Sequence, residues 1–281
     1  GGPDSHGEDG LIGTPRNWIQ IDEASVRADS QALVAPIRDG AVLAVPKSEA
    51  GVAMAATRAL IRRGVKDLHL VCVPTSGLQA DMMIGAGCVG TIECAGVTMA
   101  EHGPAPAFGR AVGKGSIGLV DSTCPAVYAG LQAAEKGLPF LPLRGLIGSD
   151  IVARRDDMPI IENPFAAADP IVAVCAIRPD VALFHAPLAD RDGNVWIGRQ
   201  RMLMIMAHAA RETLVTVEEV QECNLLDDEQ YGPATIPSLY VSAIARVEKG
   251  AWPLGLPERY GEDGEHLAEY CRESATTEGF A

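Results

Sequence analysis

The sequence is poor in aromatic and in basic residues, and it contains no long hydrophobic run. Aromatic side chains make up 5% of its 281 residues, and the formal net charge is −14 because 37 Asp and Glu outnumber 23 Lys and Arg. Nucleic-acid binding needs clustered Lys and Arg against the phosphates, so we expect no nucleic-acid partner. No apolar stretch approaches the roughly 20 residues of a membrane-spanning helix, and none has the pattern of a signal peptide, so we expect no membrane association.

Metal-ligand and dinucleotide signatures are also missing. The seven cysteines are scattered, without a Cys-x-x-Cys pair or a His at zinc-ligand spacing, so no metal site is predicted. An odd number of cysteines in a long chain is typical of reduced thiols, which indicates a cytoplasmic protein. A Gly-x-Gly-x-x-Gly loop is absent after the first predicted strand, where Pro46 stands at the point of close pyrophosphate approach. This argues against an NAD(P)-dependent enzyme.

The sequence does contain a regular alternation of strand and helix patterns. Continuous apolar runs predict buried strands, and the amphipathic or small-residue segments between them predict helices. The predicted strands are residues 41–45, 68–73, 89–94, 117–120, 171–176, 181–184, 195–197 and 213–217, and the predicted helices are 52–63, 78–87, 106–112, 126–136 and a segment through 207–210. Repeated βα units of this kind predict the α/β class, with an open, mostly parallel sheet flanked by helices.

Composition divides the chain into three parts. Residues 1–10 are polar and Gly-rich, and we expect a disordered or added terminus without a role in the fold. Residues 11–249 are expected to form one α/β domain, in which the Pro-rich piece 156–170 is a long excursion rather than a boundary. Residues 250–281 are rich in glutamate and are expected to form an acidic helical extension.

Two segments in the second half of the chain carry a family resemblance. Residues 184–194 contain the pattern HA…AD..GN, and residues 206–220 contain MA.AA..T.VTVEE. Over about residues 37–270 the chain resembles the α subunit of the family I coenzyme A transferases, of the glutaconate CoA-transferase type.

This resemblance implies a NagB/RpiA/CoA transferase-like fold and an enzyme that moves CoA between an acyl-CoA and a carboxylic acid. In this family the thioester is attacked by a glutamate of the β subunit, which then carries a glutamyl-CoA intermediate. The present chain would supply oxyanion-stabilising loops and walls of the acyl pocket, in an αβ or α2β2 assembly with a β subunit. The CoA thioester is the substrate, and no tightly bound cofactor is expected.

Ligands of open α/β sheets bind beyond the carboxyl ends of the strands, where three loops are predicted. The first is residues 46–51, where the family usually has a Gly-Gly-Phe-Gly type loop. Pro46 and Lys47 replace the glycines, so Lys47 either meets the substrate with its charge or is solvated. Ser48 and Glu49 echo a Ser-Glu-Asn-Gly motif of the β subunit, which makes Ser48 a candidate substrate contact. Glu49 is either a catalytic carboxylate or an acidic residue in the first turn of the next helix.

The second loop, residues 75–81, leads from the predicted strand 68–73 into a helix. The family has a Gly-rich element at this place. Ser76 and Gly77 are therefore candidate catalytic positions, which present backbone N–H groups to an anion or a developing oxyanion. Ser76 is alternatively, or in addition, the N-cap of the helix.

The third loop, residues 120–125, follows the predicted strand 117–120. In the family this segment lines the acyl pocket, so Ser122 and Thr123 are predicted substrate contacts and Asp121 a catalytic carboxylate. Cys124 precedes a proline at a predicted helix start. It is either a thiol of lowered pKa that contacts substrate or a small buried side chain.

Three charged residues outside these loops are further candidates. Glu93 and Glu101 frame another edge of the cleft in the family, and Glu93 is predicted to contact substrate. Arg144 is predicted to meet a substrate carboxylate or a CoA phosphate, or else to be held in a salt bridge with Asp150 or Asp121.

Two other functions remain open beside CoA transfer. One is a CoA-thioester or C–C bond hydrolase with the same subunit plan, in which Glu49 or Glu93 activates water. The other is a non-catalytic subunit that has lost its site. His185, expected just after a strand at the cleft end of the sheet, is either a general base or a packing residue.

Overall fold

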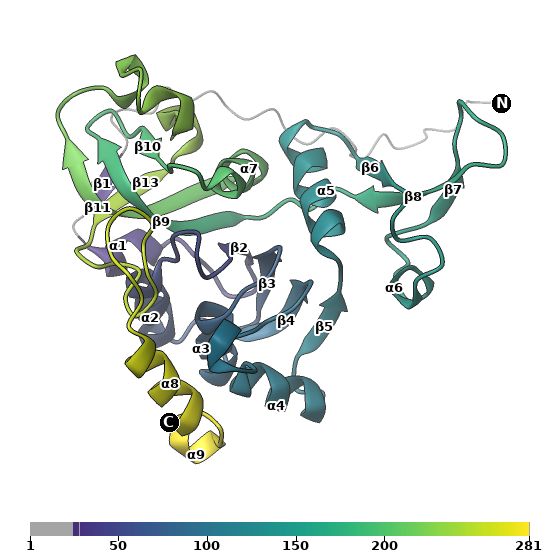
Figure 1. Cartoon of the computed structure of the whole chain (residues 1–281), viewed down its shortest axis with the longest axis horizontal. Coiled ribbons are helices and arrows are strands. Elements are labelled where there is room, and N and C mark those ends of the chain that lie inside the picture. The colour runs from purple at the N-terminus through teal and green to yellow at the C-terminus, as the bar shows by residue number, and fades with distance from the viewer. Residues whose placement is uncertain (1–24, 28, 281) are drawn as a thin grey trace, which may run out of the picture.

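The computed structural model describes residues 25–27 and 29–280, so the predicted terminus 1–10 lies outside the described residues. The main sheet consists of β1 (Ser25–Arg27), β2 (Val42–Pro46), β3 (Leu68–Val73), β4 (Val89–Cys94), β5 (Gly118–Asp121), β9 (Val181–Asp190), β10 (Val195–Trp196), β11 (Glu212–Gln221), β12 (Thr235–Ile236) and β13 (Ala243–Arg246). Its order is β1-β13-β11-β9-β2-β3-β4-β5, with parallel neighbours throughout, and β10 and β12 are added antiparallel beyond β9 (Figure 1). The predicted open, mostly parallel α/β sheet is confirmed.

Helices cover both faces of this sheet. One face packs on α1 (Ser30–Val34), α2 (Met54–Arg63), α3 (Leu78–Gly85) and α4 (Pro106–Lys114), and the other on α5 (Cys124–Glu135) and α7 (Arg201–Ala209). Successive residues of a strand point to opposite faces, so Leu70 belongs to the first core and Val71 to the second. Both are fully buried, which explains why the strands are continuous apolar runs.

The predicted strands 68–73 and 89–94 agree with β3 and β4, but the predicted strands 213–217 and 181–184 are too short, because β11 extends over Glu212–Gln221 and β9 over Val181–Asp190. The prediction ended a strand at Phe184, whereas β9 continues to Asp190 and is buried along its whole length. His185 therefore lies inside a strand and not after it, so the prediction of its place was wrong. The reason is that β11 pairs with β9 as far as Asp190, and this long-range pairing extends the strand past its polar residues.

After α5 the chain leaves the main sheet and forms a second, smaller sheet before it returns to the main sheet at β9. The smaller sheet consists of β6 (Phe140–Leu143), β7 (Ile160–Glu162) and β8 (Pro170–Cys175) in the antiparallel order β6-β8-β7, with α6 (Asp150–Ala153) beside it. In Figure 1 this sheet projects away from the main body. The predicted strand 171–176 exists, but it was wrongly expected in the parallel sheet. It packs instead in a separate small core with Leu146 and Met158.

The C-terminal part folds back over the sheet. Residues 248–263, here termed the strap, lead into α8 (Gly264–Glu273) and α9 (Thr277–Phe280). The Tyr270 hydroxyl of α8 donates to Asp81 Oδ2 of α3 at 2.7 Å, and Phe108 N–H of α4 donates to Asp81 Oδ1 at 2.7 Å. Burial raises the pKa of the Asp81 carboxyl, against the lowering effect of these hydrogen bonds. The tail is thus tied to α3 and α4.

Short 3-10 helices complete the chain: η1 (Ala100–His102), η2 (Leu225–Asp227), η3 (Gly232–Ala234) and η4 (Ser238–Tyr240). Within residues 25–27 and 29–280, none of the helices combines the length and the apolar character that crossing a bilayer requires. The predicted domain limits at 11–249 and 250–281 stay predictions.

Candidate functional site

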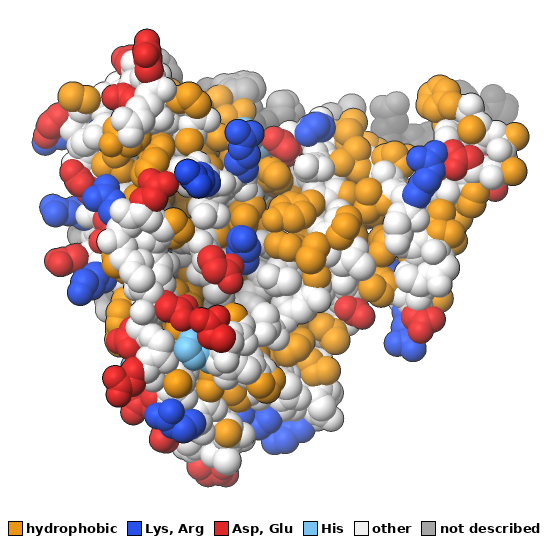
Figure 2. Space-filling view, viewed as in Figure 1, with side chains coloured by type: hydrophobic (Ala, Val, Ile, Leu, Met, Phe, Trp, Pro, Cys, Tyr) orange, Lys and Arg blue, Asp and Glu red, His pale blue; other side chains and the backbone are white. Residues whose placement is uncertain are grey.

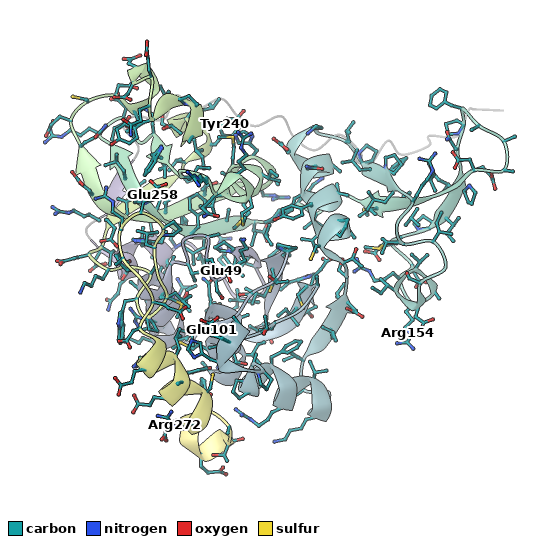
Figure 3. The ribbon with its side chains drawn as sticks, viewed as in Figure 1. Glu49, Glu101, Arg154, Tyr240, Glu258 and Arg272 are labelled. Atoms are coloured by element: carbon teal, nitrogen blue, oxygen red, sulfur yellow. The ribbon has the colours of Figure 1, made fainter. Side chains whose placement is uncertain are left out.

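A cleft of about 320 Å³ opens at the carboxyl ends of β2 and β3, where the fold predicts ligands to bind. Five segments line it: the loop after β2, the start of α3, η1 with the residue before it, the strap, and α8. Figure 3 labels two of its acidic residues, Glu49 above and Glu101 below. The lining residues are Ser48, Glu49, Leu78, residues 99–102, residues 254–257, Tyr260, Glu262 and Leu267.

Two of the three predicted loops meet at this cleft. An added Cβ on Gly77 would lie 2.4 Å from Ser48 Oγ and 2.7 Å from the backbone oxygen of Thr98. Only glycine allows this approach, because contacts under 3.0 Å require one of the partners to move. Gly77 is the N-cap of α3, so the helix begins next to Ser48, and its first N–H groups have no partner within the helix. Such N–H groups suit an anion or an oxyanion.

Ser76 contributes differently from the prediction. The prediction of Ser76 as the N-cap was wrong, because Gly77 holds that position and no side chain caps the helix. The Ser76 N–H donates to the Gly96 backbone oxygen at 3.2 Å, so this amide is already used. The side chain is buried, with 3% of the residue exposed, and its Oγ has no hydrogen-bond partner among the described residues. The Ser76 amide is therefore already engaged, whereas the first N–H groups of α3 have no partner within the helix.

Lys47 and Glu49 form an exposed pair at the mouth of the cleft. The Lys47 Nζ–Glu49 Oε2 distance is 3.9 Å, and the two side chains are 38% and 69% exposed. An exposed pair of this kind contributes about 0–1 kcal/mol. The alternative that placed Glu49 in the first turn of a helix was wrong, because α2 begins only at Met54. Glu49 lies in a turn at the edge of the cleft, with most of its side chain exposed.

The far end of the cleft gathers acidic groups around a histidine. His102 Nε2 lies 3.1 Å from Glu262 Oε1, and the potential ligand atoms of Glu101, His102 and Glu262 all lie within 4.8 Å of one another. Carboxylate and imidazole groups at this spacing are able to hold a divalent cation. The sequence did not indicate this cluster, because its members come from η1 and from the strap.

A partly buried carboxylate, Glu218, fastens the strap that forms one wall of the cleft. Glu218 Oε1 accepts hydrogen bonds from Tyr260 OH at 2.8 Å, from Gly250 N–H at 3.1 Å and from His185 Nε2 at 2.8 Å. Glu218 Oε2 accepts from Lys249 N–H at 2.9 Å. Burial alone would raise the pKa of Glu218, but these hydrogen bonds outweigh it and lower the pKa to about 2.

His185 takes part in this anchor rather than in the cleft. Its ring is completely buried, with Nδ1 2.8 Å from Thr216 Oγ1 and Nε2 on Glu218. An added Cβ on Gly250 would lie 2.5 Å from the His185 ring, so the strap passes directly over the imidazole. The contacts fit the packing and hydrogen-bonding alternative for His185.

A second group of predicted residues lies outside the lining of the cleft, at the ends of β4 and β5. Glu93 is 5% exposed and its Oε1 accepts from Arg155 NH2 at 3.0 Å. Arg155 NH1 also donates to the Asp121 backbone oxygen at 3.0 Å, and the guanidinium holds Asp157 with two further hydrogen bonds. Sequence reasoning missed Arg155 because it lies 62 residues from Glu93, so no local pattern connects the two side chains. The arrangement makes Glu93 part of an ion-pair network.

Three further predicted residues, Ser122, Thr123 and Cys124, lie at the start of α5. Ser122 is buried and its Oγ has no partner among the described residues, whereas the Thr123 side chain caps α5 by accepting from Ala126 N–H at 3.3 Å. Cys124 is exposed at the first position of the helix, so the alternative of a buried thiol was wrong.

Arg144 lies on the small antiparallel sheet, apart from both groups. Its Nε donates to Asp169 Oδ1 at 3.0 Å, and a second hydrogen bond joins the same two side chains. The predicted alternative of an internal salt bridge was right in kind but wrong in its partner, which is neither Asp150 nor Asp121. The reason is that the pairing of β6 with β8 brings residue 144 next to residue 169.

The sequence and the fold of this chain are similar to those of known proteins. The family model described as Coenzyme A transferase matches residues 27–246. An uncharacterized protein of Archaeoglobus fulgidus is 31% identical over 94% of this chain, which spans only 60% of that relative's length. The A subunit of 3-oxoadipate CoA-transferase from Pseudomonas knackmussii is 32% identical, over 77% of each chain. The structure of glutaconate coenzyme A-transferase from Acidaminococcus fermentans is similar with a TM-score of 0.82 and 27% identity, covering 91% of this chain and 86% of that one.

Proposed function

This chain belongs to the coenzyme A transferase family, and we propose that it is the α subunit of an enzyme that moves CoA from an acyl-CoA to a carboxylic acid. A similar protein is named as one of the subunits of a CoA-transferase, which supports a partner subunit of a second kind. We propose an αβ or α2β2 assembly in the cytoplasm, in which the partner supplies the nucleophilic glutamate.

The observation that carries this proposal is the meeting of Ser48 with Gly77 at the start of α3. The partner's glutamate carboxylate would attack the thioester carbonyl, and the oxygen of that carbonyl would gain negative charge. Backbone N–H groups at the start of α3 are suited to stabilise this charge, because the first N–H groups of a helix have no partner within it. We assign Gly77 to this role and Ser48 to the wall beside it.

The chemistry then proceeds by exchange of bonds to sulfur and oxygen. Attack by the glutamate breaks the C–S bond and releases the CoA thiolate, which leaves an acyl-glutamyl anhydride. The thiolate attacks the glutamyl carbonyl of this anhydride, releases the first carboxylic acid, and forms glutamyl-CoA. A second carboxylic acid takes over CoA by the same two steps in reverse. The present chain contributes the anion-stabilising helix start and the acyl cleft.

Trapping the intermediate tests this proposal. The chain is co-purified with its partner subunit, incubated with an acyl-CoA, treated with borohydride, and both chains are examined by peptide mass spectrometry. A glutamyl thioester is reduced to the alcohol, so we expect one modified glutamate, on the partner. CoA release into water without modification of either chain would contradict the transferase and favour the hydrolase, with Glu49 as the residue to examine first.

A further inference from the structure

The part of the cleft formed by η1 and the strap, which lies below Glu49 in Figure 3, is strongly acidic. Glu101 and Glu262 lie there with His102, whose Nε2 is 3.1 Å from Glu262 Oε1. Neither lysine nor arginine occurs among the described residues that line the cleft. Figure 2 shows acidic side chains gathered on this face of the molecule, around and below the strap.

Cations close to the cleft are already engaged. Lys47 pairs with Glu49 at the opposite end, next to Ser48. Arg58 donates to the backbone oxygen of Trp252 at 2.9 Å and stacks on its ring at 5.8 Å. Among the described residues that line the cleft, His102 is the one basic side chain, and Glu101 and Glu262 outnumber it, so the acidic end keeps a net negative charge even when His102 is protonated.

The wall between the two ends is apolar. It is formed by residues of α3, the strap and α8 together with the residue before η1, namely Leu78, Met99, Leu254, Leu256 and Leu267. Their side chains form one hydrophobic cluster, apart from Leu256, which is itself 1% exposed. An acyl carbonyl placed at the start of α3 would therefore extend its tail along leucine side chains toward Glu101 and Glu262.

From this arrangement, and resting on the proposed function, we propose that the cleft selects acyl groups with an uncharged far end. A tail that ends in a methyl group gains apolar contact along the whole wall. A tail that ends in a second carboxylate would face Glu101 and Glu262 without a cation to pair with. The expected donors are therefore monocarboxylic acyl-CoAs, unlike the dicarboxylic acyl groups in the names of the 3-oxoadipate and glutaconate enzymes.

The experiment compares two acyl-CoA donors of equal chain length, valeryl-CoA and glutaryl-CoA, with acetate as acceptor. The complex of this chain with its partner is assayed in EDTA, and kcat/KM is measured from the formation of acetyl-CoA. One unrelieved carboxylate repulsion in a partly exposed site is enough for about a tenfold loss, so valeryl-CoA should be preferred by about tenfold or more. Equal or better use of glutaryl-CoA would overturn the selectivity while leaving CoA transfer intact.

Variants identify the residues responsible. The double substitution Glu101→Gln with Glu262→Gln removes the repulsion but keeps the size of both side chains. It should lower the valeryl-to-glutaryl ratio of kcat/KM by about fivefold or more. Glu265→Gln, on the exposed side of α8, is the matched control and should leave the ratio unchanged. An unchanged ratio in the double variant would overturn the assignment to these residues.

Two further outcomes separate the competing explanations. Glu101, His102 and Glu262 are close enough to hold a divalent cation, which would attract a second carboxylate instead of repelling it. The assay is therefore repeated with Mg²⁺, Mn²⁺ or Zn²⁺ in place of EDTA, and a preference for glutaryl-CoA under those conditions would overturn the proposal. Absence of acetyl-CoA from both donors would refute the proposed function, and the selectivity with it.

Discussion

Replacement of Glu218 by Gln should loosen the strap, because four donors converge on this one carboxylate. Glu218→Gln keeps the shape of the side chain but replaces one acceptor oxygen by an NH2 group. In one orientation the new NH2 group faces the Lys249 N–H, which is itself a donor. In the other orientation it faces the three donors Tyr260 OH, His185 Nε2 and Gly250 N–H. A buried donor without its acceptor costs about 1–3 kcal/mol.

The pKa of Glu218 gives an independent magnitude. A fall of the pKa from 4.5 to about 2 would correspond to about 3 kcal/mol for a fully buried group. The Glu218 side chain is 13% exposed and its surroundings are partly solvated, so screening by water reduces this to about 2 kcal/mol. Both arguments lead to the same expectation of about 2 kcal/mol lost at neutral pH.

The sign of the pH dependence follows from the direction of the shift. Since the folded-state pKa is lowered, the contribution of Glu218 is fully present above its unfolded pKa of 4.5, and it is lost as the pH falls toward about 2. The stability difference between the wild type and Glu218→Gln should therefore be largest at pH 7 and shrink below pH 4.5.

Urea unfolding followed by circular dichroism at pH 7 and pH 3.5 measures this difference. Glu219→Gln is the matched control, because Glu219 follows directly in β11 but is 55% exposed and pairs with Arg259 at 3.4 Å on the surface. It should change the free energy of unfolding by no more than about 0.5 kcal/mol. Equal effects of the two variants at pH 7, or a difference independent of pH, would refute the reasoning.

Two other substitutions separate the oxyanion region from the ion-pair network. Gly77→Ala should lower kcat of the complex by about 10²–10³, since its Cβ would displace Ser48 and the Thr98 carbonyl. The control is Gly96→Ala, whose Cβ meets open space, and it should leave kcat nearly unchanged. Equal kcat for the two variants would reject the oxyanion role of Gly77. Arg155→Ala should lower the free energy of unfolding by about 3–5 kcal/mol, because it leaves the buried Glu93 without its guanidinium partner, while His69 Nε2, 3.9 Å from Glu93 Oε2, is too distant for a hydrogen bond. A loss no larger than that of Arg154→Ala, at the exposed neighbouring residue, in a thermal melt would contradict this.

Local sequence patterns were sufficient to predict most strands of the main sheet. The strand at 68–73 could be predicted because both of its faces are buried and five of its six residues are apolar, and the strand at 89–94 because β-branched Val89, Thr91 and Ile92 favour an extended chain. The start of α3 at Leu78 could be predicted because a Ser-Gly pair follows a buried strand and precedes a helical segment. These features depend on the nearest neighbours in the chain, which a sequence displays directly.

The side-chain pairs in and around the cleft could not be predicted from the sequence, because tertiary structure brings them together. His102 and Glu262 are 160 residues apart, and Arg155 lies 62 residues from Glu93, so no local pattern connects either pair. Glu218 lay within the VTVEE pattern of the resemblance, but only the folded strap reveals that it binds Tyr260 and two backbone N–H groups.

By itself, the amino-acid sequence determined the α/β class, the family, and the loops that follow the strands at the carboxyl edge of the sheet. Each of these follows from periodicity, glycine positions or a resemblance that extends along most of the chain. The tertiary structure alone decided that Ser48 meets Gly77, that Glu93 is held in an ion pair, and that acidic groups close one end of the cleft. Charge and hydrogen bonding act through space, and distances between remote segments arise only when the strap and the sheets pack together.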